Sequence, residues 1–149
     1  MIIIGRWIWF DMDGTIANLY GVIGWLQYLL DEDPYPYENA CPLVRLCTLA
    51  RLLNKLQAKG YKIGIISWLS KSGSDFYNEI VTRVKMKWLD RHLSSVKWDA
   101  IHIVPYGTPK EQFCTSPFDI LFDDEERNRS NWTGIAYDVN NIIEILKNL

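Results

Sequence analysis

Two aspartates one position apart, Asp11 and Asp13, are the residues of this sequence best suited to chemistry, and they end the stretch "WIWFDMD" (7–13). The apolar run before them predicts a strand, and alternation along a strand places residues two apart on the same side. Two carboxylates in one small volume repel each other, and Mg²⁺, which prefers hard oxygen ligands, offsets that repulsion. The pair therefore indicates either a metal site or an ordinary solvated turn at the end of a strand.

Polar side chains also follow three later apolar runs. Ser67 ends "YKIGIIS", Lys110 comes shortly after "DAIHIV", and Asp123 and Asp124 follow "ILF". In open α/β sheets the functional cleft lies at the carboxyl ends of the strands, so we expect these side chains to converge there. Each has an ordinary alternative: a capping hydroxyl for Ser67, a surface lysine for Lys110 (with Lys71 as its substitute), and a solvated loop for the acidic pair.

The elements that must position these residues alternate along the chain. Strands are expected at 2–11, 61–67, 99–104, 119–124 and 134–138. Helices are expected at 42–60 with Pro42 in the first turn, at 72–93 with Ser72 or Ser74 as the cap, and from Asn140 or Asn141 onward. Strands that alternate with helices predict the α/β class, with a Rossmann-like three-layer fold in which helices cover both faces of a parallel sheet.

Residues 16–41 do not fit this alternation. They contain one short helix-like piece followed by "DPYPY". This segment predicts a small helical cap inserted over the edge of the sheet, within a single domain that spans 1–149. Its aromatic residues, together with Trp68, could contact a substrate or pack the cap against its own domain: Tyr20, Trp25, Tyr28, Tyr35 and Tyr37. Of these we expect Tyr20, Trp25 and Trp68 at the substrate.

Composition and charge narrow the function classes. The chain has 149 residues, 48% of them hydrophobic, and a formal charge of −2, which is typical of a soluble globular protein and demands no nucleic-acid or membrane partner. No apolar run approaches membrane-spanning length. The three cysteines, Cys41, Cys47 and Cys114, lack the spacing of metal or redox sites, which favours buried or inert thiols in a reducing compartment. We therefore expect a cytoplasmic protein.

The strand-end residues resemble the signature of the haloacid dehalogenase superfamily of phosphohydrolases. "DMDGT" (11–15) is similar to its first motif, "IGIIS" (63–67) to its second, Lys110 to its third, and "ILFDDEERN" (120–128) to its acidic fourth. The resemblance extends over roughly residues 2–140 in the order of that family. Within the superfamily the chain looks most like the 5'(3')-deoxyribonucleotidase group, because of the acidic pattern at 119–124 and the helix "KMKWLDRHL" (85–93).

The resemblance implies a Mg²⁺-dependent phosphomonoesterase with an aspartyl-phosphate intermediate. Asp11 would be the nucleophile, and Asp13 would act first as general acid and then as general base. The Mg²⁺ ion would be held by the Asp11 carboxylate, the Asp13 backbone carbonyl, Asp123 and Asp124. The expected partner is a small phosphorylated substrate, foremost a nucleoside 5'- or 3'-monophosphate.

Five further residues receive roles beside these. Lys110 and the Ser67 hydroxyl would counter the negative charge of the phosphate. Gly14 and Thr15, which complete the first motif, are expected at the substrate. Asn128 is a candidate for orienting an aspartate of the fourth motif.

Other functions stay open. The substrate could be a sugar phosphate, a phosphorylated polynucleotide end or a phosphoprotein, and a mutase or a phosphotransferase would use the same intermediate. A binding module that keeps the fold without catalysis is a further alternative. A run of basic residues either attracts a polyanion or forms the solvated face of a helix: Arg83, Lys85, Lys87, Arg91 and Lys97.

Overall fold

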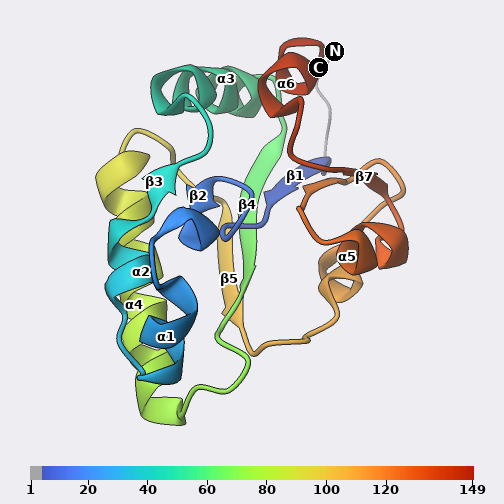
Figure 1. Ribbon diagram of the computed structural model, residues 1–149. Helices are drawn as coiled ribbons and strands as arrows, with labels where there is room; N and C mark the ends of the chain where they lie inside the picture. Colours follow the sequence, from blue (N-terminus) through green and yellow to red (C-terminus); the bar gives the residue numbers. More distant parts are fainter. Residues whose placement is uncertain (1–4) are drawn as a thin grey trace.

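A computed structural model describes residues 5–149 and contains a five-stranded parallel sheet in the order β5-β4-β1-β6-β7 (Figure 1). The strands span Trp7–Phe10 (β1), Lys62–Trp68 (β4), Ala100–Val104 (β5), Ile120–Phe122 (β6) and Ile135–Tyr137 (β7). β1 is central, with Ile8 opposite both Ile63 of β4 and Ile120 of β6. Chain order reverses on either side of β1, which makes its carboxyl end the topological switch point where such sheets bind ligands.

Three helices pack on one face of the sheet: α3 (Leu46–Ala58), α4 (Asp75–His92) and α6 (Ile142–Lys147). Their apolar side chains form one cluster with Ile8 and Phe10 of β1 and with neighbouring strands, and Leu49, Leu53 and Ile63 in this cluster are fully buried. The buried positions of α3 recur at helical spacing, so the amphipathic stripe of the sequence faces the sheet. This cluster is the main core.

The opposite face carries a smaller cluster around Trp9, covered by η2 (Lys110–Phe113) and α5 (Glu126–Asn131). Trp9 stacks on Trp7, with ring centroids 4.4 Å apart. A side chain at Gly64 would overlap the Trp9 ring, so this strand position requires glycine for a packing reason. The sheet is therefore covered on both faces, as predicted.

The cap insertion, residues 16–41, folds as β2 (Ala17–Asn18), η1 (Leu19–Gly21), α1 (Trp25–Leu30), α2 (Tyr35–Asn39) and β3 (Cys41–Pro42). It lies along α4 (Figure 1). The Tyr77 hydroxyl donates to the Asp33 carbonyl (2.9 Å) and the Trp88 indole N–H donates to the Ala40 carbonyl (2.9 Å). These bonds fix the insertion beside the carboxyl end of β1.

Several element boundaries differ from the predictions. The strand expected from residue 2 begins at Trp7; residues 2–4 lie outside the described part, and Gly5 has a left-handed φ of +76°. The helix expected from Pro42 begins at Leu46, because Pro42 pairs with Ala17 in a two-residue antiparallel ladder.

The predicted cap at Ser74 is confirmed, since its side chain accepts a hydrogen bond from the Tyr77 N–H. No pattern in the sequence predicted the short helix α5. Of the two alternatives expected for the cysteines, buried or inert thiols, burial is wrong for Cys41 and Cys47, which are exposed. Within residues 5–149, no helix has the length and apolar character needed to cross a membrane.

Candidate active site

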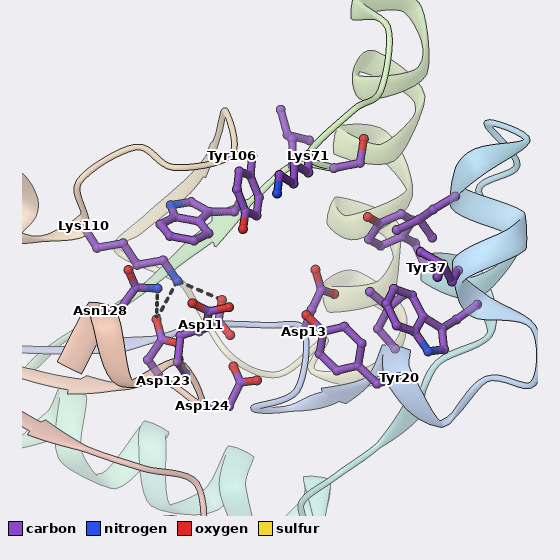
Figure 2. Close-up of a pocket in the computed structure, with 18 residues that line it drawn as sticks. Asp11, Asp13, Tyr20, Tyr37, Lys71, Tyr106, Lys110, Asp123, Asp124 and Asn128 are labelled. Carbon is purple, nitrogen blue, oxygen red and sulfur yellow. Dashed lines mark hydrogen bonds and ion pairs between the residues drawn. The ribbon is translucent and has the colours of Figure 1, made fainter. Parts of the chain in front are cut away.

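The acidic cluster, defined as Asp11, Asp123 and Asp124, lies where β1 and β6 end side by side (Figure 2). The Asp11 N–H donates to the Phe122 carbonyl (2.9 Å), so the pairing of β1 with β6 extends to Asp11 itself. One carboxylate oxygen from each of the three residues lies within 4.8 Å of the other two. Asp123 is fully buried and Asp11 is 7% exposed. The sheet therefore forces three carboxylates into one poorly solvated volume.

Lys110 is the cation of this cluster. Its ammonium group donates to Asp11 Oδ1 (2.9 Å) and to Asp123 Oδ2 (2.7 Å), and the residue is 1% exposed. Burial alone would lower the pKa of Lys110, but the two carboxylates together outweigh burial and raise it. Lys71, the other candidate for this position, lies instead at the mouth of the pocket beside Tyr106 (Figure 2).

Hydrogen bonds from the loops after β1 and β6 and from α5 hold the carboxylates in place. The Thr15 hydroxyl donates to Asp11 Oδ2 (3.0 Å), and the Asn128 amide donates to Asp123 Oδ2 (3.1 Å). The Glu125 N–H donates to Asp123 Oδ1 (2.9 Å). Asn128 thus orients an aspartate of the fourth motif, as the sequence suggested.

Gly14 and Thr15 lie beneath the acidic cluster and do not line the pocket, which differs from the substrate contact expected of them. Thr15 is fully buried. Gly14 has a φ of +80°, and a Cβ there would overlap the Asp124 carboxylate. Their role in this structure is to shape the cluster.

The cluster carries more negative charge than Lys110 can balance. Burial, with Asp11 as the next cause, raises the pKa of Asp123 to about 6 and that of Asp124 to about 8. Three carboxylates around one ammonium group leave an excess of negative charge that a divalent cation would offset. The donor set consists of hard oxygens on a rigid sheet edge, which fits Mg²⁺.

Lys85 was missed as a site residue, and neither role left open for its basic run, a polyanion surface or a solvated helix face, fits its burial. It lies on α4, is 1% exposed, and donates to Asp13 Oδ2 (2.8 Å), Ser67 Oγ (2.8 Å) and the Trp68 carbonyl (2.7 Å). Its ammonium group also lies 5.1 Å from the centroid of the Tyr37 ring. Lys85 therefore joins the first motif, the end of β4 and the cap insertion.

This lysine changes the role expected of Ser67. The Ser67 hydroxyl oxygen accepts from Lys85, and the residue is fully buried and does not line the pocket. Asp13 does line the pocket, with 16% of its side chain exposed. Burial raises the pKa of Asp13 above its ordinary range, and the ion pair with Lys85 opposes this only in part.

A pocket of about 280 Å³ opens above Asp11 and Asp13. Tyr20 and Trp25 of the cap insertion meet edge to face on one side, with centroids 4.9 Å apart. Trp68 and Tyr106 form another wall at the same centroid separation. The remaining lining residues from the cap insertion are Leu19, Leu26, Leu29 and Tyr37, whereas Tyr28 and Tyr35 stack on each other outside the pocket.

The pocket thus has carboxylates at its floor, Lys110 bridging two of them, and flat aromatic side chains as walls. Tyr106 and Arg127, whose guanidinium carbon lies 4.9 Å from the centroid of the Trp68 ring, had no signal in the sequence analysis. The loop after β5 carries Tyr106, and α5, which follows β6, carries Arg127.

No protein-family model matches the sequence, and no curated protein matches it. Two of the solved structures that match it are named as phosphatases. One is a D,D-heptose 1,7-bisphosphate phosphatase from Burkholderia thailandensis, with 14% identity over 96% of this chain and 97% of that chain and a TM-score of 0.52. The other is the D,D-heptose 1,7-bisphosphate phosphatase from B. bronchiseptica complexed with magnesium and phosphate, with 16% identity over 88% of this chain and 78% of that chain and a TM-score of 0.50. The predicted fold is confirmed: the chain has a Rossmann-like three-layer architecture, which it shares with these two structures.

Proposed function

We propose that this protein is a Mg²⁺-dependent phosphomonoesterase that forms an aspartyl-phosphate on Asp11. One observation carries the proposal: Asp11 and Asp13 line the base of one pocket while Lys110 bridges Asp11 to the buried Asp123. The magnesium and phosphate named for one structural neighbour support the same chemistry. A Mg²⁺ ion held by Asp11, Asp123, Asp124 and the Asp13 backbone carbonyl would supply positive charge to the phosphate oxygens.

Accessibility favours Asp11 over Asp123 as the nucleophile. Asp123 is fully buried, and both of its carboxylate oxygens accept hydrogen bonds, from Glu125, Lys110 and Asn128. Asp11 and Asp123 both line the pocket, but Asp11 is 7% exposed and its oxygens accept two hydrogen bonds, whereas those of Asp123 accept three. Lys110 beside Asp11 would offset the repulsion between a carboxylate and an anionic phosphate.

Asp13 suits proton transfer. In the first step an Asp11 oxygen bonds to phosphorus while the bond from phosphorus to the leaving oxygen breaks, and Asp13 gives that oxygen a proton. In the second step Asp13 takes a proton from water, the water oxygen bonds to phosphorus, and the bond to Asp11 breaks. Burial favours the protonated Asp13 that the first step requires, and Lys85 stabilises the carboxylate that the step leaves.

Nucleoside monophosphates are the substrate class that the walls of the pocket favour. Trp68 and Tyr106 on one side and Tyr20 and Trp25 on the other present flat aromatic surfaces on which a base can stack. A sugar phosphate is the second candidate, because both structural neighbours are named as phosphatases of a sugar bisphosphate.

Phosphate release from a panel of phosphate monoesters, with Mg²⁺ and with chelator, tests the proposal. Wild type should release phosphate only with Mg²⁺, and Asp11→Asn should release none. Asp90→Asn, which removes an exposed carboxylate of α4, should behave like wild type. A folded wild type that binds Mg²⁺ but releases phosphate from no ester would refute catalysis and favour a binding module.

A pair of aromatic variants tests the substrate class. Trp25→Ala removes a wall of the pocket, whereas Tyr35→Ala removes an aromatic ring of the same insertion outside it. If the protein is a nucleotidase, Trp25→Ala should lower kcat/KM for nucleotides but not for p-nitrophenyl phosphate. Tyr35→Ala should change neither. Equal loss on nucleotides and sugar phosphates would contradict base stacking.

A further inference from the structure

Lys71 lines the pocket and Arg127 contacts its wall at Trp68, and aromatic rings rather than acids hold both cations. The Lys71 ammonium lies 5.8 Å from the centroid of the Tyr106 ring, and the Arg127 guanidinium carbon lies 4.9 Å from that of Trp68. Both residues are exposed, and no ion pair joins either of them to an acid within residues 5–149. Their charges are therefore available to a ligand.

The rings of Trp68 and Tyr106 lie between these cations and the floor of the pocket at Asp11. Lys110, which binds Asp11, lies 5.4 Å from the centroid of the Trp68 ring, and the Trp68 and Tyr106 centroids are 4.9 Å apart. Lys71 follows beyond Tyr106. In Figure 2 the polar ends of Lys71 and Tyr106 both point toward the space above the acidic cluster. A row of contacts thus runs from the nucleophile to the mouth, and two aromatic rings separate Lys110 from Lys71.

A single phosphate at Asp11 would not account for Lys71 and Arg127. Lys110 would contact the phosphate on the nucleophile, whereas two aromatic rings separate Lys71 from Lys110. The other charged groups at the mouth are acidic, because Asp124 and Glu125 also line the pocket. A substrate with a second negative group would be repelled there unless cations offset these carboxylates.

We infer that Lys71 and Arg127 form a second anion subsite, which binds a second phosphate group of the substrate while the first lies at Asp11. The inference rests on the proposed function for the place of the first phosphate. The row of contacts suits a ligand whose two phosphates are separated by a sugar or a ring of similar size. The enzyme would then prefer bisphosphates to the corresponding monophosphates.

Binding to an Asp11→Asn protein, measured by isothermal titration with Mg²⁺ present, tests this subsite without turnover. The probes form two matched pairs: thymidine 5'-monophosphate with thymidine 3',5'-bisphosphate, and fructose 6-phosphate with fructose 1,6-bisphosphate. In at least one pair the bisphosphate should bind about fivefold to tenfold more tightly, because two partly solvated charge contacts are gained. Added salt should shrink the ratio.

Adding Lys71→Gln and Arg127→Gln should bring that ratio close to one. The matched control, Lys87→Gln with Arg51→Gln, removes the same charges from exposed positions of α4 and α3 and should keep it. Equal affinities in both pairs, or a preference that survives Lys71→Gln and Arg127→Gln, would overturn the inference. Absence of phosphate release by wild type would instead count against the proposed function and would leave the binding result standing.

Discussion

Replacing Lys85 by methionine should weaken the fold and the reaction together. Lys85→Met keeps an unbranched side chain in the same space but deprives Asp13, Ser67 and the Trp68 carbonyl of a donor. Breaking a buried ion pair costs 3–5 kcal/mol, and the 16% exposure of Asp13 lets water replace part of the loss, so we expect about 3 kcal/mol. For a chain of this size that loss lowers Tm by about 6–12 °C.

The same substitution should move the pH profile. Lys85 lowers the pKa of Asp13 against the effect of burial, so its removal should raise that pKa further. Because the first step needs protonated Asp13, the alkaline limb of kcat should shift to higher pH. The carboxylate also loses its anchor, and the rate at the optimum should fall by about tenfold to a hundredfold.

Thermal unfolding followed by circular dichroism, together with kcat measured against pH, checks both effects. Lys87→Met is the matched control, since Lys87 lies on the exposed side of the same helix. In an Asp13→Asn background Lys85→Met should cost less, with an interaction energy of at least about 1 kcal/mol between the two positions. A Lys85→Met protein with the Tm and pH profile of the control would refute the reasoning.

Two further predictions concern the acidic cluster. Gly14→Ala should cost about 1–2 kcal/mol and weaken Mg²⁺ binding, because a Cβ at a φ of +80° is strained and would push on Asp124; urea unfolding and Mg²⁺ titration check this, and unchanged values would contradict it. Without metal, the raised pKa values of Asp123 (about 6) and Asp124 (about 8) mean that the folded state holds more protons than the unfolded state from about pH 4 to pH 8. The Tm of the metal-free protein should therefore fall from pH 5 to pH 8, and Mg²⁺ should raise it most at pH 8; a metal-free Tm that rises over this range would show the sign to be wrong.

The strand ends could be predicted because central parallel strands appear as apolar runs and the residues after them must meet at one edge. The residues after three strands do meet, because Lys110 donates hydrogen bonds to both Asp11 and Asp123. This part of the site depends on strand order, which the alternation of elements limits to few possibilities.

Lys85 could not be placed in the same way, because its burial depends on partners from three separate segments. Hydropathy alone puts a lysine in water, although its spacing from the buried Val81 and Trp88 sets it on the buried stripe of α4. The late start of α3 has a similar cause, since the preference of Pro42 for a first helical turn lost to pairing with Ala17. The short α5, "ERNRSN", has no apolar periodicity that could have predicted it.

Trapping the covalent intermediate tests the central claim most directly. Borohydride reduces an aspartyl-phosphate to homoserine, which peptide mass spectrometry locates in protein quenched during turnover with Mg²⁺. Homoserine at position 11, absent without substrate and absent from Asp11→Asn, is the predicted result. Turnover with no modified residue, or with homoserine at another aspartate, would contradict the assignment of Asp11 as the nucleophile.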